Sequence, residues 1–263
     1  MCNKATMTGK IAIVTGGARG LGKSIAEKLL REGATVIIAD LLEKELKETV
    51  KVFCENGLKA EEYNIDLLKV SAINEMIDQI ANRHGKIDIL VNNAGIQIRK
   101  KAIEFSEEDW EHLIGVNLKS YYFASTAAAR VMIKQGGGAI VCISSVNSSR
   151  FSSKRSLYGI SKGGVDALVA TLGVEWARYG IRINAVAPGF LDTEMYRAGV
   201  KAGIINAEEV LSVMPTNRLI MTSEVASAVC FLASDEASGI VGQTLFVDGG
   251  CSKNCLPEGR ELK

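Results

Sequence analysis

The sequence predicts an α/β protein with a single doubly wound parallel β-sheet of about seven strands flanked by helices. Short apolar runs of β type alternate with helical stretches along the 263 residues, which is the pattern of successive β–α units. The strand-like runs are almost continuously apolar, so helices are expected to cover both faces of the sheet. No linker or low-complexity segment interrupts the pattern, which favours one domain.

Strands and helices are expected to alternate over most of the chain. The predicted strands cover residues 11–15, 35–39, 59–64, 87–92, 139–143, 181–186 and 244–247. The predicted helices cover residues 21–32, 43–55 and 71–84, a region that starts near Ser106, and a helix that carries Tyr158. Ser106 precedes an acidic first turn and can cap its helix. Gly33, Gly85 and Gly180 follow helical runs, where a left-handed residue is needed.

The expected organisation is one catalytic domain over residues 1–263, with a core over about 9–250 and a polar tail over 251–263. A chain of this length can bury a sizeable core by itself. The least regular stretch covers residues 191–217, beyond the end of a strand, where a substrate lid would lie. An ordinary helical connection is the alternative for this stretch.

Charge and composition argue against several classes of partner. The formal net charge is +1 and the pI about 7.5, so no nucleic-acid-binding surface is expected. No apolar run reaches the roughly 18 residues that cross a bilayer, and no signal-type segment follows Met1, which predicts a cytoplasmic protein without a membrane partner. The six cysteines are scattered, without a C-x-x-C pair or a histidine cluster, so neither a metal site nor a disulfide framework is predicted.

A glycine-rich turn follows the first predicted strand and leads into the first predicted helix. Glycines let such a turn fold tightly and let the backbone approach a pyrophosphate, which lies against the positive end of the helix. The turn therefore predicts a dinucleotide site, and its candidate residues are Gly16, Arg19, Gly20, Leu21 and Gly22. A tight strand-to-helix turn without a ligand is the alternative.

Asp40 closes the second predicted strand and bears on the choice of cofactor. A carboxylate at this point can accept hydrogen bonds from the adenosine ribose, and it repels a 2′-phosphate. Arg19, in the glycine turn, could instead attract that phosphate. Because the charge of Asp40 would lie at the ribose itself, we expect NAD(H) to be preferred over NADP(H).

Tyr158 and Lys162 lie four residues apart on a predicted helix, and such residues share one face. A free tyrosine titrates near pH ~10, and a positive neighbour within a few Å favours its charged form. The pair is therefore predicted to act as an acid/base device near neutrality. Taken alone, this spacing also occurs by chance on helices that carry no chemistry.

Several motifs in this order resemble the short-chain dehydrogenase/reductase family, over roughly residues 9–250. The motifs are Thr15-Gly16-x-x-x-Gly20-x-Gly22, Asn92-Asn93-Ala94-Gly95, Asn117, Ser145, Tyr158-x-x-x-Lys162, and Pro188-Gly189 with Thr193. The resemblance implies a Rossmann-type fold and reversible hydride transfer between NAD(P) and a secondary alcohol or ketone. Tyr158 would be the general acid/base. Lys162 would hold the nicotinamide ribose and lower the pKa of the phenol, helped by the positive charge of oxidised nicotinamide.

The resemblance also implies roles for other residues. Ser145 would hydrogen-bond the substrate oxygen, and the family's usual spacing to the tyrosine selects it over Ser144. Asn117 would help to hold a proton-relay water; a helix-kink or cap residue is its alternative. The remaining cofactor contacts would come from Asp66, Asn93, Ala94, Gly95, Pro188, Gly189 and Thr193. A helix N-cap is the alternative for Asp66. The family further implies a homotetramer, or a dimer, with the Tyr158 helix in one interface.

The substrate is expected to be a small alcohol or ketone. Residues 93–97, Arg99 and Glu104-Phe105 are most similar to the gluconate 5-dehydrogenase and 2-deoxygluconate 3-dehydrogenase branch, which implies a sugar acid or polyol. The cations Arg99, Lys100, Lys101, Arg150, Lys154 and Arg155 could attract a carboxylate, or form a solvated basic face. Alternatives are a hydroxysteroid dehydrogenase, a 3-oxoacyl reductase, against which Asp40 counts, and a nucleotide-binding redox sensor or scaffold without turnover.

Overall fold

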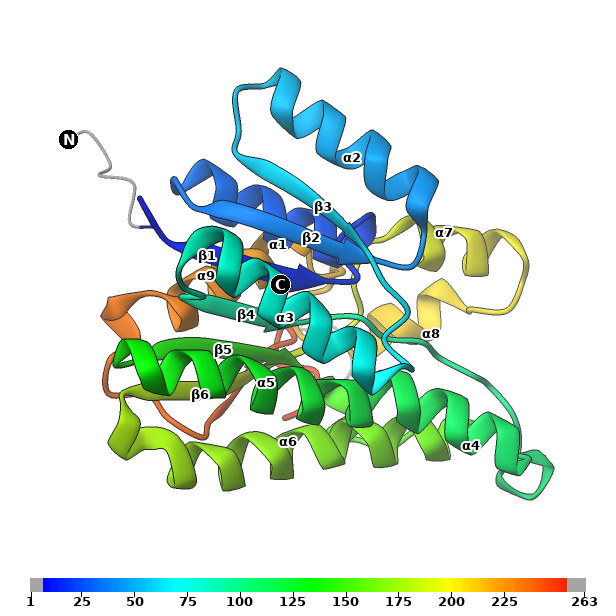
Figure 1. Cartoon of the computed structure of the whole chain (residues 1–263). Coiled ribbons are helices and arrows are strands. Elements are labelled where there is room, and N and C mark those ends of the chain that lie inside the picture. Colours follow the sequence, from blue (N-terminus) through cyan, green and yellow to red (C-terminus); the bar gives the residue numbers. More distant parts are fainter. Residues whose placement is uncertain (1–6, 255–263) are drawn as a thin grey trace.

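The computed structural model of the protein describes residues 7–254, apart from the side chain of Met195. It contains a seven-stranded sheet in the order β3-β2-β1-β4-β5-β6-β7, and every pair of neighbouring strands is parallel (Figure 1). The strands are β1 (Ile11–Thr15), β2 (Thr35–Asp40), β3 (Ala60–Asn64), β4 (Ile89–Asn92), β5 (Gly138–Ile143), β6 (Ile181–Pro188) and β7 (Thr244–Val247). The predicted doubly wound parallel sheet is confirmed.

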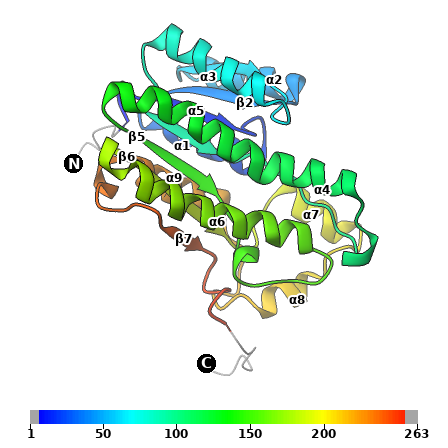
Figure 2. The same ribbon diagram turned by 60° about the horizontal axis from the view of Figure 1, so that its bottom comes forward.

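Helices cover both faces of this sheet. They are α1 (Gly20–Arg31), α2 (Glu43–Glu55), α3 (Val70–His84), α4 (Glu107–Ile114), α5 (Ser120–Gln135), α6 (Ser156–Trp176), α7 (Glu194–Lys201), α8 (Ala207–Ser212) and α9 (Thr222–Ala233). In Figures 1 and 2, α3, α5 and α6 lie over one face, and α1 and α9 lie over the other. A π-helical turn, η2 (Gly115–Lys119), joins α4 to α5.

The alternation of side chains along each strand divides the core into two apolar clusters. Val14 of β1 packs with Ile25 of α1 and Val229 of α9 in the first cluster. The preceding residue, Ile13, belongs to the second cluster, together with Ile77 of α3. Neighbouring residues on a strand point to opposite faces, so continuously apolar strands are needed to fill both clusters.

The order of strands reverses at β1, which pairs with β2 on one side and β4 on the other. Ligands of such sheets bind beyond the carboxyl ends of the strands at this reversal, because the two flanking loops diverge there. Asp40 and Pro188 are the last residues of β2 and β6, one and two residues beyond the predicted ends. The helix-ending glycines have positive φ as expected, with 94° at Gly33, 77° at Gly85 and 73° at Gly180.

Residues 191–217 contain two short helices. The hydroxyl of Thr193 accepts from the backbone of Tyr196 and begins α7, and Asn206 caps α8. Figure 2 shows α7 and α8 near the end of the sheet where α6 begins. Of the predicted tail, residues 255–263 lie outside the described residues, as do Cys2 and the segment that follows Met1. Within residues 7–254, none of the helices is both long and apolar enough to span a membrane.

Candidate active site

The glycine turn between β1 and α1 leaves no room for a side chain at Gly22 or Gly16, where it would meet backbone atoms. A Cβ atom at Gly22 would lie 2.0 Å from the carbonyl oxygen of Gly16 and 2.5 Å from Nδ2 of Asn93. A Cβ atom at Gly16, where φ is +63°, would lie 2.7 Å from Cα of Ala94. The turn therefore packs backbone against backbone, as a site that brings main-chain N–H groups to a phosphate requires.

Thr15 and Asn93 hold this turn against the end of β4. Nδ2 of Asn93 donates to the carbonyl oxygens of Thr15 and Gly16, both at 2.9 Å. The hydroxyl of Thr15 accepts from the backbone N–H of Asn93 at 3.0 Å and of Ala94 at 3.2 Å. Thr15 was part of the glycine motif but not a predicted site residue. The sequence feature that could have identified Thr15 is its position as the last residue of the first strand, beside the end of the parallel strand β4.

The amino end of α1 fits a diphosphate. Arg19 precedes the helix in an extended conformation, and no side chain caps the first turn, which also contains no acidic residue. The first N–H groups of a helix have no partner inside it, and the helix dipole makes this end positive. Gly20, Leu21 and Gly22 would donate these N–H groups to the pyrophosphate of a dinucleotide. The side chain of Arg19 is exposed to solvent.

Asp40 is buried beside the glycine turn and makes two backbone contacts. Oδ2 accepts from the N–H of Ala18 and Oδ1 from the N–H of Leu42, both at 3.0 Å. Each oxygen keeps a second lone pair, so the carboxylate can still accept from a ribose hydroxyl.

Asp66 accepts from the N–H of Leu68 at 3.1 Å in a turn before α3, whose N-cap position is Lys69. The helix-cap alternative for Asp66 is therefore wrong.

Tyr158, Lys162 and Ser145 come together where β5 ends and α6 begins. Nζ of Lys162 lies 5.8 Å from the centre of the Tyr158 ring and donates to the carbonyl oxygen of Ile143 at 2.7 Å. The side chain of Ser145 hydrogen-bonds Tyr158 and accepts from the backbone of Asn147 at 3.2 Å. The hydroxyl of the adjacent Ser144 donates to the carbonyl oxygen of Lys162 at 3.3 Å, so it is Ser145 that meets the phenol.

The pKa of Tyr158 moves in the opposite direction to the one expected from its lysine neighbour. Burial raises the pKa of Tyr158 above its ordinary value, and the hydrogen bond with Ser145 and the charge of Arg155 lower it only in part. Burial also lowers the pKa of Lys162 to about 8. The expectation failed because spacing along a helix gives proximity and does not report desolvation.

Asn117 lies in the π-helical turn η2 and is completely buried. Its amide nitrogen donates to the carbonyl oxygen of Ile96 at 2.9 Å and to Oγ of Ser161 at 3.3 Å. Its Oδ1 accepts from the N–H of Ile96 at 2.9 Å. Both amide hydrogens are in use, so Asn117 ties the segment after β4 to α6, and only Oδ1 has capacity left for a water. Such single π turns are frequent at functional sites.

The carboxyl end of β6 lies at the same end of the sheet as the other site residues. Gly189 has no room for a side chain, since a Cβ atom there would lie 2.9 Å from Cα of Asp248. Pro188 pairs with Val247 of β7, and Thr193 begins α7. Most of the predicted site residues thus lie at the carboxyl ends of strands or in the segments that directly follow them, whereas Asn117 lies in the π-helical turn between α4 and α5.

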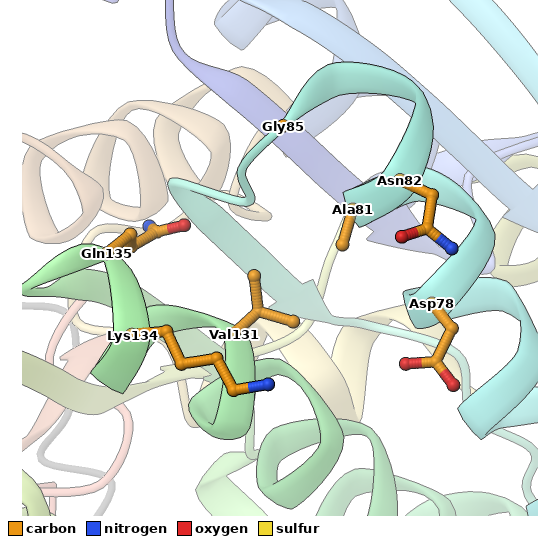
Figure 3. Close-up of a pocket in the computed structure, with 7 residues that line it drawn as sticks. All are labelled: Asp78, Ala81, Asn82, Gly85, Val131, Lys134 and Gln135. Carbon is orange, nitrogen blue, oxygen red and sulfur yellow. The ribbon is translucent and has the colours of Figure 1, made fainter.

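A cavity of about 540 Å³ lies at the opposite end of the strands and is not part of this site (Figure 3). Its walls come from the carboxyl-terminal parts of α3 and α5, including Asp78 and Lys134. Since β4 and β5 begin just after these helices, the cavity is at the amino ends of the strands. Among residues 7–254, no group of three or more His, Cys, Asp or Glu side chains could hold a metal ion.

Known proteins of similar sequence cover almost the whole chain. Residues 16–252 match the family model described as enoyl-(acyl carrier protein) reductase. A 3-oxoacyl-[acyl-carrier-protein] reductase of Thermotoga maritima is 38% identical over 246 residues, which are 93% of this chain and 98% of that protein. A 2-dehydro-3-deoxy-D-gluconate 5-dehydrogenase of Escherichia coli is 35% identical over 246 residues, which are 93% and 96% of the two chains.

Solved structures agree with these sequence relatives. The crystal structure of a gluconate 5-dehydrogenase from Burkholderia cenocepacia, in complex with NADP and tartrate, has a TM-score of 0.89 and 36% identity to this chain. The match covers 95% of this chain and 98% of that one. Similarity of this strength in both sequence and structure shows that the chain belongs to the short-chain dehydrogenase/reductase family and is an NAD(P)-dependent oxidoreductase.

Proposed function

We propose that the protein is a dehydrogenase for a small hydroxy acid, with a sugar acid as its best candidate, and that it prefers NAD(H) to NADP(H). A bound nicotinamide supplies the hydride acceptor in oxidation and the hydride donor in reduction. Tyr158 would take the hydroxyl proton of the alcohol during oxidation and return it to the carbonyl oxygen during reduction. Ser145, which hydrogen-bonds the phenol, would orient the substrate oxygen.

The remaining catalytic roles follow from position. Lys162 would bind the nicotinamide ribose, and Oδ1 of Asn117 would contribute to a water relay toward solvent. Because burial raises the pKa of Tyr158, the phenol carries its proton at neutral pH and is ready to act as an acid in reduction. Oxidation requires the phenol to lose that proton first, so the oxidation rate would rise with pH.

Two guanidinium groups beside Tyr158 carry the proposal of an acidic substrate. The N–H of Lys100 donates to the carbonyl oxygen of Lys154 at 3.2 Å, which joins the segment after β4 to the loop before α6. Arg99 and Arg155 are each one residue from this bond. Burial and then the charge of Arg99 lower the pKa of Arg155, and Arg155 lowers that of Tyr158. Arg155 therefore lies near both Arg99 and the reacting group.

Other cations of this region already have partners. Lys100 contacts Asp109 at 2.5 Å, Lys101 contacts Glu104 at 3.6 Å, and Arg150 donates to the carbonyl oxygen of Cys251. Within residues 7–254, neither Arg99 nor Arg155 forms an ion pair; Arg99 donates to Oε1 of Gln97 at 3.3 Å. Two neighbouring guanidinium groups that lack an acidic partner are stabilised by the carboxylate of a bound substrate. A sugar acid carries such a carboxylate, and a polyol or steroid alcohol does not.

Replacing Arg155 with alanine is expected to raise KM for gluconate about tenfold or more, while the fall in kcat that follows from losing a charge that lowers the pKa of Tyr158 is shared by every substrate. A hydrogen bond to a charged group contributes about 1.5–3 kcal/mol, and a contact with the remote carboxylate acts on ground state and transition state alike. The measurement is steady-state kinetics with gluconate and with the uncharged polyol sorbitol.

Lys101→Ala is the matched control, since it removes a nearby cation that already pairs with Glu104. It should leave KM for gluconate unchanged. An unchanged KM for gluconate in Arg155→Ala, or equal rises in KM with gluconate and sorbitol, would refute the carboxylate contact.

The proposed preference for NAD rests on Asp40 of this chain, because the similar Burkholderia structure contains NADP. Asp40→Asn keeps the shape of the side chain and removes the charge that would repel a 2′-phosphate. The ratio of kcat/KM with NAD to kcat/KM with NADP is expected to fall about tenfold or more in this variant. A wild-type preference for NADP would show that Arg19 outweighs Asp40.

A second candidate is a 3-oxoacyl thioester reductase, which the relative from Thermotoga maritima favours.

We further propose that the protein forms a homotetramer, or a dimer, through the α6 face. On this face Val174 is 85% exposed and Ile160 is 50% exposed, and Phe151, just before α6, is 75% exposed. Large apolar side chains gathered on one face favour association.

A further inference from the structure

The ammonium group of Lys162 is buried without a carboxylate partner. Only 3% of the residue is exposed, and within residues 7–254 no Asp or Glu lies at ion-pair distance from Nζ. Among the described residues, its one hydrogen bond is to the carbonyl oxygen of Ile143, at 2.7 Å. A buried charge that lacks an ion partner is costly, so some other group must help to keep this lysine protonated.

Two aromatic rings supply that help. Nζ lies 5.1 Å from the centre of the Tyr121 ring and 5.8 Å from the centre of the Tyr158 ring. A cation within about 6 Å of a ring face is attracted to it, more strongly where water is excluded. Tyr121 comes from α5 and is completely buried, and its ring is the nearer of the two.

The hydroxyl of Tyr121 has no part in this contact. Its oxygen is buried and has no hydrogen-bond partner in the structure. A buried hydroxyl without a hydrogen bond lowers stability, so the hydroxyl does not explain why a tyrosine lies at this position. Burial also raises the pKa of Tyr121 well above its ordinary value, which keeps the phenol neutral. The ring, and not a phenolate charge, is what meets Lys162.

The other titratable groups around Lys162 are few. Cys142 of β5 is a neutral thiol, because burial raises its pKa to about 12. Asp166, one turn further along α6, favours the charged lysine at longer range and accepts a hydrogen bond from Thr244 at 3.1 Å. Tyr158 keeps its proton at neutral pH. None of these groups replaces a direct counter-ion.

We propose that Tyr121 is a positioning residue whose ring holds the Lys162 ammonium charged and in place for the nicotinamide ribose. The inference rests on the proposed function only for the role of Lys162 toward the ribose. The contact between ring and ammonium involves residues of this chain alone. The charge state of Lys162 can therefore be measured independently of any substrate.

The test compares Tyr121→Phe, which keeps the ring, with Tyr121→Met and Tyr121→Leu, which remove it. The titration midpoint of Lys162 is followed by NMR of 13C-lysine-labelled, cofactor-free protein, with Lys162→Arg to assign the signal. The wild-type midpoint is expected at about pH 8. Tyr121→Phe should leave it unchanged, and the two ringless variants should lower it by about one pH unit. NADH affinity, measured by fluorescence at a series of pH values, should fall with rising pH as Lys162 loses its proton. In the ringless variants this fall should occur at a pH that is lower by the same amount.

A midpoint that stays or rises in the ringless variants would overturn the proposal, as would an equal fall in Tyr121→Phe. Methionine nearly fills the space of the phenol, so this variant serves if the leucine variant does not fold. A shifted Lys162 midpoint with unchanged pH dependence of NADH affinity would support the ring contact and count against Lys162 as the ribose ligand. The failure of the inference and of the proposed function can thus be told apart.

Discussion

Replacing Tyr158 with phenylalanine is expected to lower kcat about 10³-fold while the dissociation constant for NADH changes less than about twofold. The variant keeps the ring near Lys162 and removes only the oxygen that exchanges the proton. Positioned proton transfer contributes about 10²- to 10⁴-fold to a rate. The measurements are turnover followed by NADH absorbance and NADH binding followed by fluorescence.

Tyr179→Phe is the matched control, because Tyr179 lies just beyond the carboxyl end of α6, is partly exposed, and accepts a hydrogen bond from Arg178 at 2.7 Å. It should retain full activity. Full activity in Tyr158→Phe would remove this tyrosine from the mechanism.

Replacing Gly22 with alanine is expected to abolish measurable NADH binding and to lower Tm by roughly 5–10 °C. The added methyl group would lie 2.0 Å from the carbonyl oxygen of Gly16, which is a backbone atom and cannot move without opening the turn. Overpacking costs about 1–3 kcal/mol, with a backbone clash at the upper end, and 1 kcal/mol corresponds to about 2–4 °C in a chain of this size. Thermal unfolding and NADH fluorescence measure the two effects.

Gly239→Ala provides the comparison, since no atom lies within 4 Å of a Cβ built at Gly239. It should bind NADH normally and unfold within about 2 °C of the wild type. Normal binding by Gly22→Ala would show that the glycine turn is not the cofactor site.

Much of the fold could be predicted because its strands are short apolar runs with clear ends. The bounds of β1, α2 and β7 are as predicted, and each other strand end lies within two residues of its predicted place. The two helices α7 and α8 had local signals in the capping residues Thr193 and Asn206. These signals were weak beside the strong alternation elsewhere.

The site was predicted less completely, because its energetics depend on contacts between distant segments. The π turn at Asn117 is held by hydrogen bonds to Ile96, which lies 21 residues away along the chain. The contact of Tyr121 with Lys162 joins α5 to α6. The unpaired guanidinium of Arg155 could be recognised only after the partners of the neighbouring cations were known. Residue spacing cannot report burial, so it also gave the wrong direction for the pKa of Tyr158.

We expect this protein to turn over a small hydroxy acid with a nicotinamide cofactor. The most direct measurement is NADH absorbance with purified protein, both cofactors and a panel of gluconate, tartrate, sorbitol, a hydroxysteroid and an acetoacetyl thioester. Turnover is expected to be fastest with an acid from this panel and with NAD(H). Binding of NADH without turnover of any panel member would contradict this expectation and favour a nucleotide-binding sensor instead.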